Sequence, residues 1–239
     1  MKVLITAGST NVMIDQVRCI SNIFKGRTGS ELARYFFYNV PGSWSIDLIT
    51  SNHKYFGSDD IVRGINILPY KTYDELYSLM EKQITSNDYD IIIHSAAVSD
   101  YKVEGTYYYD YDSKDEKGFA CLPGMSKVDS SKKISSSSKE LYLKLVPTEK
   151  IIDKIRNPWG FKGKLIKFKL QVGITDQELI DIAYKSMLAS KADFIVANCL
   201  EWSQERAFIL NTGPYNNMEV KETKRSTLPC VLFKSLGIL

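Results

Sequence analysis

Short, uninterrupted apolar runs alternate along the chain with segments whose apolar residues recur every three or four positions. The runs predict buried strands, since a strand covered on both faces shows no polar side. We expect strands at residues 2–6, 46–50, 65–68, 90–94, 140–146, 164–170 and 193–197. The helical spacing predicts helices at residues 29–37, 72–84, 148–156 and 176–190, the second of them capped by Thr72 or Tyr73.

This alternation predicts an α/β fold: a Rossmann-like, doubly wound, mostly parallel sheet with helices on both faces. Weak alternation after about residue 207 predicts a small antiparallel C-terminal addition. We find no repeat and no separating linker, and therefore expect one domain over residues 1–239. The pattern lapses over residues 99–139, which are rich in Tyr, Asp, Lys and Ser, and a long flap is expected there.

Composition narrows the function classes. A hydrophobic content of 44% is ordinary for a globular protein, and a net charge of +3 suits a small anionic ligand better than a nucleic acid. Four cysteines without CxxC spacing and only two histidines argue against zinc, a catalytic dithiol or a disulfide framework. No secretory leader is evident, and no apolar run approaches the ~20 residues of a membrane helix. We expect a cytoplasmic protein with no nucleic-acid or membrane partner.

The turn after the first predicted strand carries the first candidate chemistry. Ligands of open parallel sheets bind outside the carboxyl ends of the strands. Gly8, Gly26 and Gly29 could let backbone amides approach a phosphate there, although glycines that merely shape a turn are an equal alternative. Their spacing does not give GxGxxG, and the second strand ends in Thr50-Ser51-Asn52 without an acid for a ribose. Both departures disfavour a nicotinamide dinucleotide.

Asp15, Arg18 and Asn22 follow at spacings of three and four, which on a helical turn would give a shared face and an ordinary surface ion pair. The Asn22 amide is of greater chemical interest, because it can donate to a carbonyl oxygen that gains charge during acyl transfer. Lys133 lies near the end of the flap. A flap lysine is either solvated or swings over a bound phosphate or oxyanion when the loop closes.

The segment HSAAVSDY (94–101) runs from a strand into a polar turn. Ala96 and Ala97 permit close approach of a ligand, and Asp100 could accept hydrogen bonds from it. His94 beside a serine suggests a hydrolase, but the nucleophile elbow GxSxG is missing. We therefore expect a buried histidine satisfied by the backbone.

Five motifs in order now carry a resemblance. AGST with IDQVRCISN, then HSAAVSDY, KKISSSSKELYLKLVPTEKI, IKFKL and DFIVAN resemble phosphopantothenate–cysteine ligase (phosphopantothenoylcysteine synthetase) from about residue 1 to about 210. The compact length resembles the stand-alone bacterial form. The resemblance implies coenzyme A biosynthesis in two steps. The carboxylate of 4′-phosphopantothenate attacks the α-phosphorus of a nucleoside triphosphate, with Mg²⁺ and loss of pyrophosphate. The amine of L-cysteine then displaces the nucleoside monophosphate from the acyl intermediate.

The resemblance also implies a homodimer with a composite active site, and CTP rather than ATP on the grounds of length. Asn22 would hold the acyl carbonyl, and Lys133 would stabilise charge during turnover. The residues implied to bind phosphopantothenate are Ala96, Ala97, Asp100 and, from the second subunit, Arg18. Those implied to bind the nucleotide are Gly8, Gly26, Gly29, Phe168, Asn198 and, for the triphosphate, Lys185.

Four departures from the family pattern stand near these positions, the first being Ser9 where the family has the second glycine of Gly-Gly-Thr. Phe24 replaces a nucleotide-contacting serine, Lys167 precedes Phe168 where the family has glycine, and Cys199 follows Asn198 where it has aspartate. Lys167 would either contact a phosphate or point to solvent. A nicotinamide-dependent reductase and a non-catalytic nucleotide-binding or dimerisation module are the remaining alternatives.

Overall fold

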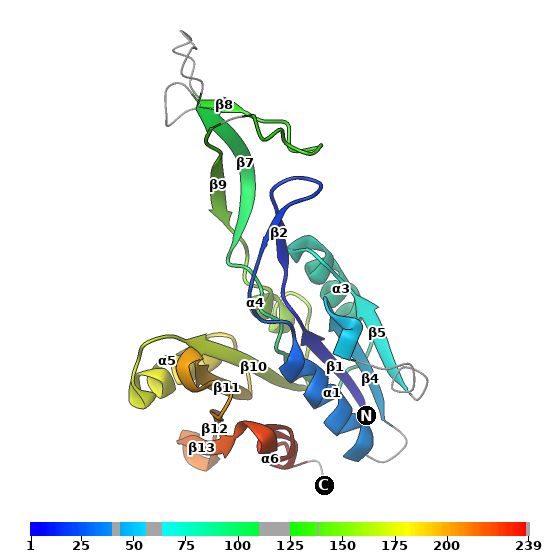
Figure 1. Ribbon diagram of the computed structural model, residues 1–239. Coiled ribbons are helices and arrows are strands. Elements are labelled where there is room, and N and C mark those ends of the chain that lie inside the picture. The colour runs from blue at the N-terminus through cyan, green and yellow to red at the C-terminus, as the bar shows by residue number, and fades with distance from the viewer. Residues whose placement is uncertain (40–43, 56–63, 110–124, 138, 238–239) are drawn as a thin grey trace.

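The computed structural model describes residues 1–39, 44–55, 64–109, 125–137 and 139–237. An eight-stranded sheet in the order β13-β12-β11-β10-β6-β1-β4-β5 forms its centre (Figure 1). Its strands are β1 (Lys2–Ala7), β4 (Ser45–Thr50), β5 (Ile65–Pro69), β6 (Ile91–His94), β10 (Lys164–Gln171), β11 (Phe194–Cys199), β12 (Arg206–Thr212) and β13 (Met218–Lys224). Pairing is parallel from β5 to β11 and antiparallel for β12 and β13. The predicted α/β class, with its antiparallel addition, is confirmed.

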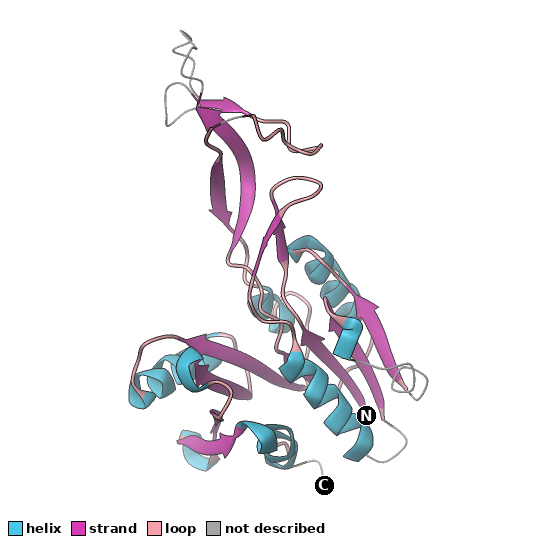
Figure 2. Ribbon diagram, in the orientation of Figure 1, coloured by secondary structure: helices cyan, strands magenta, loops and turns pink. Residues whose placement is uncertain are grey.

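Helices cover both faces of this sheet, because successive strand residues point to opposite sides (Figure 2). On one face, Leu4 packs in a core with α3 (Tyr73–Ser86), α4 (Ile151–Arg156) and α5 (Asp176–Ala189). On the other, Ile5 packs with α1 (Arg27–Asn39) and α6 (Leu228–Ser235). Both side chains are fully buried. In the described part of the chain, no helix is both long and apolar enough to cross a membrane.

Helix starts follow local hydrogen bonding. Thr72 caps α3 through a capping box with Glu75, as the sequence predicts. The helix predicted from residue 148 instead begins at Ile151. The Thr148 hydroxyl donates to the Ser99 carbonyl at 2.7 Å, and its N–H donates to the Asp100 carbonyl at 2.9 Å. Thr148 therefore extends the loop pairing and does not cap the helix.

The C-terminal part holds more core than the sequence pattern predicts. The sequence predicts only a weakly patterned antiparallel addition after about residue 207, but β12 is buried over Ala207–Leu210. Phe208 and Leu210 belong to one core, and Ala207 and Ile209 to the other. The sequence pattern did not indicate α6, which packs against one face of β12. Because both faces of β12 are covered, its apolar residues are consecutive and do not alternate with polar ones.

The expected flap is partly regular. Strands β7 (Tyr101–Tyr109), β8 (Met125–Lys127) and β9 (Tyr142–Pro147) form a separate antiparallel sheet in the order β8-β7-β9. It projects away from the central sheet (Figure 1). The prediction of irregular structure was wrong for these parts of 99–139, because Tyr and Thr favour strands once a distant partner is available. Flap residues 110–124 and 138 lie outside the described residues.

A hairpin stands beside this projecting sheet, with β2 (Asn11–Met13) next to β7. Its second strand is β3 (Cys19–Ser21), and its turn closes where the Ile14 N–H donates to the Arg18 carbonyl at 2.9 Å. The helical turn expected for Asp15, Arg18 and Asn22 was therefore wrong. Asp15 and Arg18 do pair, but the aspartate is buried and the pair belongs to a hairpin turn.

Candidate active site

The loops that follow β1 and β6 exchange backbone hydrogen bonds at the carboxyl edge of the sheet. The Ala97 N–H donates to the Gly8 carbonyl at 2.8 Å, and the Ala97 carbonyl accepts from the Thr10 N–H at 3.2 Å. The same carbonyl accepts from the Asn22 side-chain amide at 3.1 Å. The structure thus brings Gly8, Asn22 and the Ala96–Ala97 pair together, as the predicted site requires.

Three glycines make this approach sterically feasible. A Cβ on Gly26 would lie 2.3 Å from the Gly8 nitrogen, and a Cβ on Gly8 would lie 2.1 Å from the Ser51 hydroxyl. Both glycines have positive φ. Gly29 is the third residue of α1, and a Cβ there would lie 2.6 Å from that of Ala7. The three glycines therefore serve close packing, and a phosphate contact by their amides stays a prediction.

His94 forms the buried end of β6. Its Nδ1 lies 2.9 Å from the Thr6 hydroxyl, which also accepts from the Ala96 N–H at 3.1 Å. The expected backbone partner is therefore replaced by the Thr6 hydroxyl. Burial, assisted by the positive charge of Lys167, lowers the pKa of His94 to about 4. The ring is neutral near pH 7 and is a structural element of the site floor.

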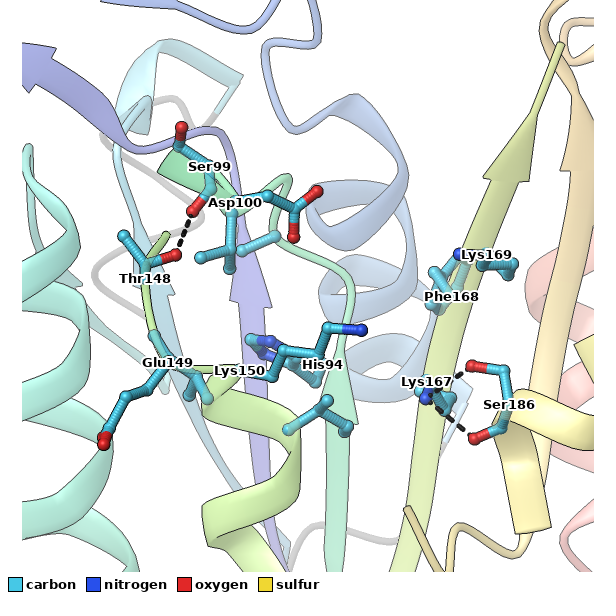
Figure 3. Close-up of a pocket in the computed structure, with 14 residues that line it drawn as sticks. His94, Ser99, Asp100, Thr148, Glu149, Lys150, Lys167, Phe168, Lys169 and Ser186 are labelled. Carbon is cyan, nitrogen blue, oxygen red and sulfur yellow. Dashed lines mark hydrogen bonds between the residues drawn. The ribbon is translucent and has the colours of Figure 1, made fainter. Parts of the chain in front are cut away.

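A cavity of about 190 Å³ opens between the carboxyl ends of β6 and β10 and the loop before α4 (Figure 3). Ala96, Asp100 and Phe168 from the predicted site line it. The remaining lining residues are His94, Val98, Ser99, Thr148, Glu149, Lys150, Ile151, Ile152, Lys167, Lys169 and Ser186. Three lysines against two carboxylates make the cavity suited to an anion.

Lys167 is buried and does not point to solvent, and a phosphate contact by its side chain stays a prediction. Its Nζ donates to the carbonyl and hydroxyl of Ser186, both at 3.0 Å (Figure 3). It also donates to the Ser190 hydroxyl at 3.1 Å. Burial lowers its pKa to about 8. The side chain ties β10 to the last turn of α5, and its charge reaches the cavity through space.

The other predicted residues lie elsewhere. Arg18 is bonded to Asp15 in the hairpin turn, and it also donates to the Ile134 carbonyl of the flap. Lys133, the residue before Ile134, is exposed. Asn198 sits near the end of β11 opposite Leu170, while Lys185 is exposed on α5. None of these four lines the cavity in the described part of the chain.

Sequence reasoning missed the loop 148–150 and Lys169, which form one side of the cavity. A signal was available, since both follow or end predicted strands at the carboxyl edge where ligands bind. It also missed Ser51, whose hydroxyl accepts from the Ser9 N–H at 2.9 Å. That contact depends on the fold and has no local sequence signature.

The fold and this lysine-rich cavity define a Rossmann-like α/β protein with a candidate anion site at the carboxyl edge of its sheet. Residues 1–118 match the family described as DNA/pantothenate metabolism flavoprotein C-terminal domain. The crystal structure of the DNA/pantothenate metabolism flavoprotein from Streptococcus pneumoniae is similar at a TM-score of 0.76 and 28% identity, covering 99% of this chain and 98% of that one. Together with these matches, the bifunctional coenzyme A biosynthesis protein CoaBC of Thermococcus kodakarensis, 28% identical over 228 residues, confirms the resemblance to phosphopantothenate–cysteine ligase.

The chain corresponds to only part of its curated relative. The match to the Thermococcus protein spans 94% of this chain but 48% of that protein, so the chain spans about half the length of the curated relative. A structure of a Cab2 variant in complex with phosphopantothenate-cysteine has a TM-score of 0.65 at 15% identity, covering 98% of this chain and 84% of that one. It supports the fold.

Replacing Gly26 tests the packing of the glycine loop. Gly26→Ala should lower the free energy of unfolding more than Gly160→Ala, measured by urea denaturation. Both positions have positive φ, which costs an alanine about 1 kcal/mol, but nothing lies within 4 Å of a Cβ at Gly160. We expect the clash at Gly26 to add about 2 kcal/mol. Equal losses in the two variants would contradict this packing.

His94 should make stability depend on pH. Its pKa is lowered from 6.5 to about 4, so between these values the unfolded chain binds a proton that the folded protein excludes. Its contribution is therefore fully present above pH 6.5 and is lost as pH falls toward 4, by about 3 kcal/mol. His94→Gln should flatten the measured profile of unfolding free energy over this range, whereas the exposed His53→Gln should not. Parallel profiles for wild type and His94→Gln would exclude this effect.

Proposed function

We propose that the chain ligates 4′-phosphopantothenate to L-cysteine through an acyl-nucleotidyl intermediate, as a step of coenzyme A biosynthesis in the cytoplasm. The observation that carries the proposal is the position of the Asn22 amide against the Ala97 carbonyl, beside a lysine-rich cavity. This amide is the group expected to face an acyl carbonyl. The confirmed resemblance supports the same reaction, and the proposal treats residues 1–239 as one functional domain.

In the first step, the carboxylate of phosphopantothenate would attack the α-phosphorus and expel pyrophosphate. Ala96 and Ala97 would let the substrate approach the backbone, and Asp100 would accept its hydrogen bonds. Asn22 would donate to the acyl oxygen as charge develops there. In the second step, the amine of cysteine would attack the acyl carbon and expel the nucleoside monophosphate. Lys133 would offset the negative charge of the reacting groups.

The cavity is the proposed nucleotide site. Lys150 and Lys169 would face the phosphates, and Phe168 would provide an apolar contact. The loop containing Gly8, Gly26 and Gly29 would present backbone amides, with Asn198 nearby at the same sheet edge and Lys185 reaching the triphosphate from α5. CTP is the proposed nucleotide, with ATP as its competitor in the test.

Magnesium would enter with the triphosphate. Mg²⁺ is usually held by phosphate oxygens, waters and one or two carboxylates. Asp100 lines the cavity and would provide one such oxygen ligand, which fits an ion held mainly by phosphate oxygens and waters, whereas the Glu149 carboxylate is paired with Lys154 at 2.9 Å. The ion would neutralise charge on the phosphates. Asp100 would then serve both the metal and phosphopantothenate.

A homodimer forms part of the proposal. Apolar side chains are exposed on the β2–β3 hairpin and just after it, notably Val17 at 65% and Ile23 at 73% exposure. Tyr101 on β7 and Leu145 on β9 are exposed as well. Clustered exposed apolar groups of this kind mark interaction sites. A second copy packed here would bring its own Arg18 toward the site, where the resemblance places that residue.

Pyrophosphate release tests the reaction directly. Purified protein with Mg²⁺, phosphopantothenate and cysteine should release pyrophosphate from CTP and not from ATP. Release should require phosphopantothenate, and the amide product should require cysteine. No release from either nucleotide would refute the ligase, and release from ATP alone would overturn the nucleotide assignment.

Lys133→Gln should slow turnover by at least a hundredfold without changing the melting temperature, since the exposed side chain makes no packing contribution. Lys132→Gln is the matched control, because it removes the same charge from the adjacent exposed residue. Steady-state rates of pyrophosphate release measure both. Near-normal turnover in Lys133→Gln, or an equal loss in the control, would remove Lys133 from the mechanism.

A further inference from the structure

The flap segment that follows Lys133 is bound by a charged pair in the β2–β3 turn. One Asp15 carboxylate oxygen, Oδ2, accepts from the Ile134 N–H at 3.0 Å. The Arg18 guanidinium donates to the Ile134 carbonyl at 2.9 Å, and its Nε donates to the same Oδ2 at 2.9 Å. Asp15 and Arg18 thus bind both polar groups of one residue that lies more than a hundred positions away in sequence.

Burial singles out the same residue. Ile134 is 5% exposed, whereas its described neighbours 131–133 and 135–137 are all exposed. Asp15 is 3% exposed and accepts through Oδ1 from the N–H groups of Val17 and Arg18, at 2.8 and 2.7 Å. The turn therefore holds the carboxylate in a fixed orientation. Within the described residues 131–137, Ile134 is the single buried attachment point.

The attachment acts on Lys133 through the chain. Adjacent Cα atoms are about 3.8 Å apart, so fixing both polar groups of Ile134 restricts where the backbone of Lys133 can lie. We propose that Asp15 is a positioning residue: through Arg18 and the Ile134 peptide, it sets the reach of Lys133 toward the site. This inference rests on the proposed ligase function. Asp15 touches no substrate and performs no proton transfer.

Asp15 keeps its negative charge over the ordinary pH range. Its hydrogen bond with Arg18 holds the pKa of the carboxyl well below its usual range, helped by the N–H groups of Ile134 and Val17. The carboxylate therefore stays ionised at neutral and mildly acidic pH. Hydrogen bonds to a charged group are stronger than neutral ones, which suits a single attachment point.

Trypsin tests the attachment independently of activity. It cleaves after lysine, and the residue that follows Lys133 is Ile134, whose N–H and carbonyl are held by the Asp15–Arg18 pair. Asp15→Asn should raise the rate of cleavage between Lys133 and Ile134 in the folded protein about tenfold, detected by mass spectrometry. Ile134→Ala removes the buried side chain without altering the turn, and should act in the same direction. Asp129→Asn is the matched control, since this exposed aspartate bonds Ser131 and belongs to neither the Asp15–Arg18 pair nor the Ile134 peptide. Unchanged cleavage in both test variants would overturn the attachment.

Turnover then tests positioning. Asp15→Asn and Ile134→Ala should lower kcat about tenfold with little change in the KM for nucleotide, and Asp129→Asn should leave kcat unchanged. In a Lys133→Gln background, Asp15→Asn should have almost no further effect, because the lysine that it positions is gone. Full additivity would overturn positioning through Lys133. If the unaltered protein releases no pyrophosphate, the proposed function fails and positioning with it, while the cleavage rates still decide the attachment.

Discussion

The close approach of Gly26 to Gly8 is the constraint on which the candidate site depends. Any side chain at Gly26 would meet the backbone of the β1 loop at 2.3 Å. With none there, the segment before α1 lies against the end of β1 and returns Asn22 to the Ala97 carbonyl. The loop after β6 is bound to the same strand end through the Ala97 and Gly8 peptides. The absence of a Cβ at Gly26 thus allows three loops to pack against one another.

The lysines at the cavity differ in their surroundings. The Lys167 ammonium is fully bonded by Ser186 and Ser190, and its lowered pKa reflects its burial. Lys150 and Lys169 line the same cavity. Because a bonded lysine still contributes its positive potential when protonated, Lys167 raises the attraction for an anion without having to move.

Strands β1, β6 and β11 of the central sheet were predictable because they are buried on both faces and read as apolar runs. Helix α3 was predictable because Thr72 and Glu75 form a local capping signal. The attachment of the β2–β3 hairpin to the flap was not predictable, since the contact joins Asp15 to Ile134 across the chain. For the site, sequence placed Asn22, Ala97 and Phe168 at the correct edge. It gave no means to foresee that Lys167 would be bonded by α5, because that distance depends on packing. The roles of these residues stay predictions.

The edge strand β13 has a consequence for assembly. Glu219, Lys221, Glu222 and Lys224 are exposed along it, and it lies at one end of the eight-stranded order. Exposed charges on an outer strand discourage another chain from adding to the sheet by backbone pairing. This edge is therefore poorly suited to repeated strand addition, whereas the surface of the β2–β3 hairpin exposes apolar side chains such as Val17. An association through that surface, related by a two-fold axis, would close on itself and produce a finite pair rather than a growing fibre.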